Sequence, residues 1–175
     1  IETLKGYNAW IKSGKKDACK VIAVAVDKDS KQCSGWHYNP SKDKEPRLIE
    51  GLGSLWLDDK GDVDGKGRMW LYFQVGSSDQ SDNYAANCFS DVKWGSKSAY
   101  DILKDCKTDT EAFQGLVQIF TKLYPEKKTV LGCKGDVEID AIYVMQEMFN
   151  MAMMLRHPTD SINVRETLTK LQIAF

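Results

Sequence analysis

The sequence predicts an α+β protein in which a small antiparallel β-sheet from the N-terminal half packs against C-terminal helices. One observation is a change of pattern: β-branched and alternating stretches occupy the first half, and helical periodicity occupies the second. Another is composition, since 42% of the 175 residues are hydrophobic and 28% are charged, as in globular chains. We expect one domain over 1–175, mainly strands in 1–76, a loop in 77–97 and mainly helices in 98–175.

Short strands and turns account for the start of the chain. A weak amphipathic helix is expected over Thr3–Lys12, followed by a β-branched strand over Lys20–Val26. A turn at Asp27–Ser30 then lets Gln32–Tyr38 return as the hairpin partner of that strand. The sequence Asn39–Pro40 ends the second strand, because proline cannot donate a backbone hydrogen bond.

Two further strands, Leu48–Leu57 and Arg68–Val75, are expected on either side of the segment Asp58–Gly67. The second carries aromatic and aliphatic residues on both faces, which is typical of a central strand. The connecting segment is rich in glycine and aspartate and predicts a hairpin tip. Its aspartates do not fit a calcium loop, because that pattern needs an oxygen ligand at Lys60 and a closing glutamate at Leu71.

Helical signals begin after a polar segment, Gly76–Tyr84, that we expect to be a mobile loop between the two halves. A Ser-x-x-Asp pattern at Ser98 predicts a short helix that ends near Cys106. Thr108 and Glu111 form a capping box, in which each side chain satisfies a free backbone N–H, and they predict the start of a longer helix.

The remaining elements follow from proline positions and apolar spacing. Pro125 ends the helix that the capping box begins, and Lys127–Cys133 is expected to form a strand. The longest helix is expected over Asp136–His157, with a broad apolar face, and Pro158 ends it. A short closing helix is expected over Val164–Ile173.

Charge and motif content argue against several classes of function. The chain has 24 Lys and Arg against 25 Asp and Glu, so its whole surface does not attract nucleic acid or anionic lipid. No apolar stretch reaches the roughly 20 residues that cross a bilayer. The sequence contains no serine-hydrolase elbow, phosphate-binding loop or HExxH zinc motif, so we expect a binding function, no cofactor and no metal site.

Five widely spread cysteines indicate disulfides in an oxidising compartment. We expect two bridges from four of the five and one remaining thiol that could link two chains as a dimer. The chain begins with Ile1 rather than Met, as in a processed or trimmed protein, which also suits a secreted molecule. Five reduced thiols in an intracellular protein are the alternative. The cysteines are Cys19, Cys33, Cys88, Cys106 and Cys133.

The segment Asn87–Cys106 resembles part of the small secreted fungal proteins of the killer-toxin-like effector type. A cysteine, a short serine-rich loop and a helix ending in Asp-Cys follow one another, and Leu131–Cys133 is similar to a later Gly-x-Cys strand of that family. The match covers about 50 of the 175 residues, and five cysteines depart from the family's even number. The resemblance implies a secreted α/β sandwich that acts by binding, and it assigns no catalytic residue.

We therefore expect a secreted, disulfide-containing toxin or effector that binds a protein or glycan target on a host or competitor cell. Aromatic and basic side chains around residues 36–47 and 76–94 form the expected contact surface, because such side chains combine apolar area with polar groups. The expected binding residues are Trp36, His37, Tyr38, Arg47, Tyr84 and Trp94.

Two alternatives stay open. A cytotoxic enzyme that acts on RNA is one, with His37 and His157 as the acid and base of a ribonuclease. Glu147 and Arg156 are the corresponding pair for an rRNA N-glycosidase, although nine residues separate them. RNA is a partner only under this alternative. The other is an intracellular protein-interaction domain with reduced cysteines.

Overall fold

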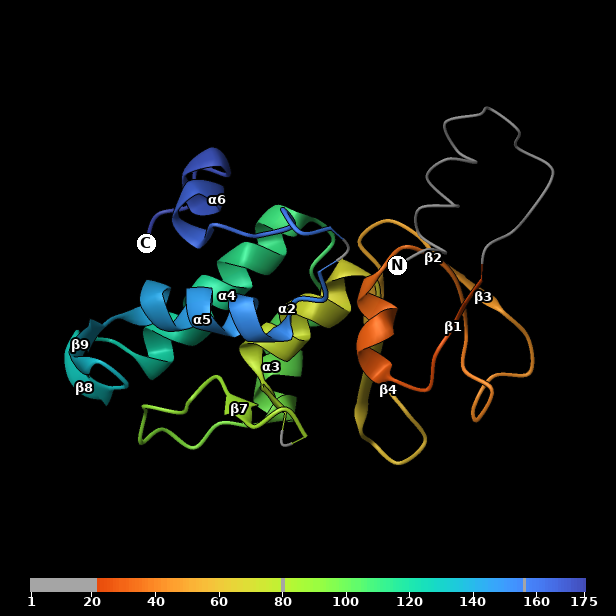
Figure 1. Ribbon diagram of the computed structural model, residues 1–175, viewed down its shortest axis with the longest axis horizontal. Helices are drawn as coiled ribbons and strands as arrows, with labels where there is room; N and C mark the ends of the chain where they lie inside the picture. The colour runs from red at the N-terminus through yellow and green to blue at the C-terminus, as the bar shows by residue number, and fades with distance from the viewer. Residues whose placement is uncertain (1–21, 80, 156) are drawn as a thin grey trace.

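The computed structural model describes residues 22–79, 81–155 and 157–175, and an apolar helix lies at its centre (Figure 1). This helix, α2 (Arg68–Gly76), is buried from Met69 onward and packs against three other helices. The strand expected at Arg68–Val75 was therefore wrong. A short run that is apolar on every face predicts full burial, but it does not distinguish a strand from a helix.

Four more helices surround α2 or extend the helical side of the molecule. The longest, α4, begins as predicted, with the Thr108 hydroxyl accepting a hydrogen bond from Glu111 N at 3.1 Å. The first, α3, begins two residues before Ser98 and has no side-chain cap, so that expected start was wrong. The helices are α3 (Ser96–Leu103), α4 (Asp109–Leu123), α5 (Ala141–Ala152) and α6 (Val164–Lys170).

The hairpin β8–β9 occupies the segment where the longest helix was expected to begin. Strand β8 (Lys128–Gly132) confirms the expected strand, and β9 (Gly135–Ile139) pairs with it antiparallel. Helix α5 starts only after Asp140, whose side chain accepts from Tyr143 N at 2.7 Å. The segment before Asp140 has β-branched residues in alternation, and pairing with β8 outweighs its weak helical pattern.

The first three strands form one small sheet in the order β1–β2–β3. Strand β1 (Ile22–Val24) runs parallel to β2 (Gly35–Tyr38), so the hairpin expected between them was wrong. The reason is the 3₁₀ helix η1 (Lys28–Gln32), which carries the chain back to the starting edge so that both strands point the same way. Strand β3 (Arg47–Ile49) is antiparallel to β2.

Strands β4 (Ser54–Leu57) and β5 (Val63–Lys66) form a hairpin, but its second strand lies inside the segment 58–67 that was expected to be only the tip. The strand expected over Leu48–Leu57 is divided between β3 and β4. Two glycines at the base of the hairpin, Gly53 and Gly67, have φ values of +82° and +69°. A Cβ atom at Gly67 would lie 2.9 Å from the Cα of Gly53, so both backbones need glycine to approach this closely.

The polar segment after α2 is not the free loop that was expected. Strand β6 (Ser78–Asp79) pairs antiparallel with β7 (Tyr84–Ala85) within it. Asp79 is 5% exposed and Tyr84 is 7% exposed, so the segment is anchored to the rest of the molecule. The helix expected at Thr3–Lys12 lies outside the described residues.

The α+β class is confirmed, but the strands form separate small sheets instead of one. No sheet among the described residues has more than three strands. The main core lies between helices, with residues such as Leu116, Phe120, Met145 and Phe149 almost fully buried. Figure 1 shows the helices on one side of the molecule and β1–β5 with η1 on the other. Within the described chain, each helix is too short or too polar to cross a membrane.

Candidate functional site

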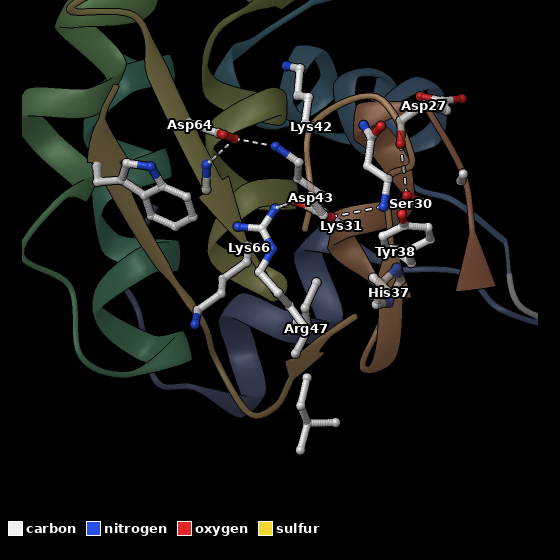
Figure 2. A pocket seen from close by; sticks show the side chains of 16 residues that line it. Asp27, Ser30, Lys31, His37, Tyr38, Lys42, Asp43, Arg47, Asp64 and Lys66 are labelled. Carbon is white, nitrogen blue, oxygen red and sulfur yellow. Dashed lines mark hydrogen bonds and ion pairs between the residues drawn. The ribbon is translucent and has the colours of Figure 1, made fainter. Parts of the chain in front are cut away.

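A charged pocket lies between the β1–β3 sheet, η1 and the β4–β5 hairpin (Figure 2). Its volume is about 110 Å³, which is small beside the roughly 300–1,000 Å³ typical of sites for drug-sized ligands. It suits one charged group or side chain of a larger partner. The lining residues that carry the argument are Lys31, His37, Tyr38, Lys42, Asp43, Arg47, Trp56, Asp64 and Lys66.

The pairing of β2 with β3 brings the predicted binding residues together. His37 and Arg47 are direct cross-strand partners, and Tyr38 follows His37 on the same strand. Asp43, whose side chain is only 8% exposed, accepts a hydrogen bond from the Arg47 guanidinium. Its other oxygen accepts from Asn39 N at 2.9 Å. The turn between the strands therefore fixes the direction of Arg47.

Across the pocket, Lys31 of η1 forms an ion pair with Asp64 of β5. The Lys31 ammonium also lies 5.5 Å from the centroid of the Trp70 ring, within the range of a cation–π interaction. The backbone of Gly67 donates to the Lys31 carbonyl at 2.8 Å. These contacts hold the hairpin against η1 and set the width of the pocket.

The two ion pairs leave the pocket with a positive excess. Its lining holds the cations Lys31, Lys42, Arg47 and Lys66 and the carboxylates Asp27, Asp43 and Asp64. Lys42 and Lys66 are exposed and form no ion pair with any described residue. The Asp27 carboxylate caps η1 by accepting from Asp29 N at 2.9 Å. Figure 2 shows the Arg47 guanidinium between these two lysines, whose side chains point away from each other at opposite ends of the pocket, so an acidic group entering from solvent would meet a positively charged rim.

His37 is held in one orientation. Its Nε2 donates to the Cys33 carbonyl at 2.9 Å, which leaves Nδ1 as a buried acceptor without a described hydrogen-bond partner. Burial lowers the pKa of His37 below its ordinary value of 6.5, although the bond to Cys33 acts in the opposite direction. The ring is therefore neutral near pH 7 and adds no charge to the pocket.

Among the described residues, the structure does not bring together the two histidines that the ribonuclease alternative needs. His157 is exposed and contacts the Thr159 hydroxyl at 2.8 Å, and no described hydrogen bond or cavity joins it to His37. Glu147 lies on α5 and accepts from the Asn150 amide at 3.3 Å. Arg156 lies outside the described residues.

Glu147 instead lines a second cavity, of about 350 Å³, between α5, the β8–β9 hairpin and the segment around β7. Tyr84 and Tyr143 also line it, so two aromatic rings do accompany this carboxylate. The exposed side chains of Leu131 and Met151 make the cavity largely apolar. Such a surface favours an apolar group over a charged nucleotide.

The expected binding residues therefore do not form one surface. His37, Tyr38 and Arg47 line the charged pocket, and Trp36 is half-buried on the same strand, β2. Trp94 is half-buried elsewhere, and its indole N–H donates to the Gly76 carbonyl at 2.8 Å. Tyr84 is buried beside β6.

The structure corrects the expected disulfides. Cys88, Cys106 and Cys133 are thiols, so at most one bridge is possible among five cysteines instead of two. Burial raises the pKa of the Cys88 and Cys106 thiols, which disfavours their reactive thiolate forms. Cys33 is half-buried, and Cys19 lies outside the described residues.

Comparisons with known proteins leave the site to be interpreted from its own geometry. No protein-family model matches the chain, and no curated protein or solved structure among those compared matches it either.

Proposed function

We propose that the protein acts by binding, and that the charged pocket receives an acidic side chain of a protein target. The observation that carries the proposal is the guanidinium of Arg47, which Asp43 holds in place inside the pocket, with the exposed lysines Lys42 and Lys66 at opposite ends of the pocket (Figure 2). A planar guanidinium recognises a carboxylate through two parallel hydrogen bonds, and nearby ammonium groups add attraction without strict geometry.

Pocket size and aromatic residues support a macromolecular partner. A cavity of about 110 Å³ holds a carboxylate group, while Tyr38 and Trp56 at its wall provide apolar contact area around it. Binding of this kind relies on a charged anchor surrounded by a broader surface.

The biological role that we propose is that of a secreted effector or toxin with a target on a host or competitor cell. Its support is the similarity of Asn87–Cys106 to killer-toxin-like effectors. The cysteines no longer add to that support, because three of them are thiols. The same three thiols favour a second candidate, an intracellular interaction domain that uses the same pocket.

An NMR titration of the isotope-labelled protein tests the pocket. The probes are a peptide of six glutamates with blocked ends and the matched peptide of six glutamines. We expect the acidic peptide alone to shift the amide signals of Tyr38, Lys42 and Lys66. The dissociation constant should rise with salt, because exposed charges are screened within about 10 Å at 0.1 M.

Paired variants locate the binding charge. The double variant Lys42→Ser/Lys66→Ser should weaken binding of the glutamate peptide by about threefold to tenfold, given the modest energy of exposed ion pairs. Lys93→Ser/Lys97→Ser removes two exposed charges elsewhere and should bind like the natural sequence. Equal losses in both variants would contradict the proposed site, and so would shifts spread evenly over the surface.

Two further measurements separate the remaining functions. Thiol titration of the denatured protein should give at least three reactive groups, and a count of one would contradict the structure. Ribosomal RNA incubated with the protein should stay intact. Cleavage or depurination that His37→Ala or Glu147→Ala abolishes would replace the binding proposal by the RNA alternative.

A further inference from the structure

Three carboxylates from two separate parts of the chain meet beside β6. Asp29 comes from η1, Asp79 from β6 and Asp82 from the turn that follows, and one oxygen of each lies within 4.8 Å of the others. The surrounding contacts hold two of them in place: the Gln74 amide donates to Asp29, and Ser81 N donates to Asp79 at 2.9 Å. The cluster is therefore ordered before any ligand arrives.

A buried hydroxyl faces the same cluster. Tyr84 is the direct cross-strand partner of Asp79, so the two side chains lie on the same face of the β6–β7 ladder. Its side chain is 7% exposed, and its hydroxyl has no hydrogen-bond partner among the described residues. The charges of Asp79, Asp29 and Asp82 all act on this hydroxyl and, after burial itself, raise the pKa of Tyr84. A buried hydroxyl without a partner is costly, so it calls for a bound group.

The charge of the cluster matches a divalent ion. Lys28 forms an ion pair with Asp79, so three carboxylates and one ammonium leave two negative charges. Lys28 has a side chain that is 47% exposed and can move toward solvent. The site therefore holds more negative charge than its single lysine neutralises.

We propose that Asp29, Asp79 and Asp82 bind a calcium ion, and that a water molecule on this ion is the hydrogen-bond partner of the Tyr84 hydroxyl. Calcium takes six to eight oxygen ligands at about 2.3–2.6 Å, so two oxygens on opposite sides of the ion lie roughly 5 Å apart. The carboxylate spacing fits this sphere, and water completes it because Asp82 is exposed. Magnesium binds at about 2.0–2.1 Å in a strict octahedron, which a cluster from two chain segments suits less well.

The ion would join distant parts of the chain. Asp29 and Asp79 are separated by fifty positions, and the ion would fasten η1 to the β6–β7 segment. The charged pocket is lined by other residues of η1. A test of the calcium site is therefore independent of a test of the proposed binding function.

Calorimetry and thermal unfolding of the chelator-treated full chain test the site. Calcium chloride should bind with a stoichiometry of one. At a concentration a hundred times the dissociation constant, calcium should raise the Tm by about 5–10 °C, since only the folded state assembles the ligands. Magnesium chloride at the same concentration should give a smaller rise.

Four variants separate a cation site from an ordinary acidic surface. Asp82→Asn changes an exposed side chain and should weaken calcium binding at least tenfold, while Asp91→Asn, an exposed acid outside the cluster, should bind normally. Tyr84→Phe should weaken binding several-fold but leave the calcium-free Tm unchanged or higher, because it removes a hydroxyl without a partner. Lys28→Met should tighten binding about threefold to tenfold by removing a competing cation.

The results decide in either direction. Weaker calcium binding by Asp82→Asn together with tighter calcium binding by Lys28→Met supports the site. Weaker calcium binding by Tyr84→Phe supports the contact between its hydroxyl and the water on the ion. Absence of calorimetric binding at millimolar calcium would overturn the proposal. It would also be overturned if Asp82→Asn and Asp91→Asn bound calcium equally.

Discussion

A guanidinium–carboxylate pair fixes how α2 meets α4. Arg68 Nε and Nη2 each donate to one oxygen of Asp109 at 2.8 Å, and the Tyr72 hydroxyl donates to the same carboxylate at 2.6 Å. The hydrogen bond from Arg68 holds the pKa of Asp109 below its ordinary value. Two parallel hydrogen bonds define an orientation as well as a distance, so this pair aligns the starts of both helices.

We predict that Asp109→Asn lowers the free energy of unfolding by about 0.5–1.5 kcal/mol, because the charged pair is lost at a half-exposed position. Urea denaturation at pH 7 measures the loss. Asp101→Asn removes an exposed pair with Lys104 and should cost less than about 0.5 kcal/mol. The stabilisation by Asp109 is fully present above the pKa of aspartate in the unfolded chain. It should disappear as the pH falls through the lowered pKa of Asp109 in the folded protein. Equal losses at pH 7 would contradict this role.

The second prediction for a single side chain concerns how His37 changes the stability of the protein with pH. Its pKa is lowered in the folded state, so between that value and 6.5 the unfolded chain binds more protons and stability falls as the pH falls. His37→Gln keeps a donor for the Cys33 carbonyl and cannot titrate. Unfolding free energies measured from pH 7.5 to 5 should therefore decline less in this variant. His157→Gln is the control, and a His37→Gln slope equal to that of the natural sequence would rule out the effect.

At the scale of elements, the base of the β4–β5 hairpin depends on close backbone contact. A Cβ atom at Gly53 would lie 1.9 Å from the Lys66 carbonyl oxygen, whereas Gly61, at the hairpin tip, has a similar positive φ and open space. The two glycines therefore separate backbone strain from steric overlap.

We expect Gly61→Ala to cost about 1–2 kcal/mol, the usual penalty for a left-handed residue with a side chain. Gly53→Ala should cost at least about 3 kcal/mol, because the overlap with backbone atoms adds to that strain. Urea denaturation of both variants provides the comparison. If the two losses are the same, the close approach does not contribute to stability.

Elements with a polar face and a cap could be predicted from sequence, and fully buried ones could not. Helix α4 has both signals, and its start at Thr108 is confirmed. Helix α2 has no polar face, so nothing in its own residues reveals the helical period. The parallel pairing of β1 with β2 depends on the path of η1, which a local turn signal does not determine.

The residues of the candidate site that are close in sequence could be predicted, and those that tertiary packing brings together could not. His37 and Arg47 could be proposed because they belong to the aromatic and basic segment 36–47, but their direct pairing across β2 and β3 is known only from the structure. Lys66 reaches the pocket only when the β4–β5 hairpin packs on η1, and no spacing in the sequence indicates that contact. The meeting of Asp29 with Asp79 is likewise a result of tertiary packing.

At the scale of the whole molecule, one buried glutamine joins three parts of the chain. The Gln32 amide donates to the Gln74 side chain and to the Ala152 carbonyl, both at 2.7 Å. Its oxygen accepts from Met154 N at 3.1 Å. The end of η1 is thus bonded to α2 and to the end of α5, so the N-terminal strands and the helices share one polar connection.

Replacing this residue tests the connection. Gln32→Leu leaves the Ala152 carbonyl, Met154 N and the Gln74 oxygen without their present partner and should cost about 2–4 kcal/mol. Gln118→Leu changes an exposed residue of α4 and should cost less than about 0.5 kcal/mol. Far- and near-ultraviolet circular dichroism during urea unfolding should give coincident transitions for the natural sequence. Separate transitions would show that the two parts unfold independently.

The burial of α2 has a consequence for synthesis on the ribosome. Its apolar faces are covered by α3, α4 and α5, and the last of these ends at Ala152, 76 residues after the end of α2 at Gly76. At about 5–20 residues per second, translation takes roughly 4–15 s to produce those partners. During that interval the nascent chain has η1, the β4–β5 hairpin and then α3 to pack on this helix, and the apolar surface that α4 and α5 cover stays exposed. A chaperone that shields emerging polypeptides would find its binding site there.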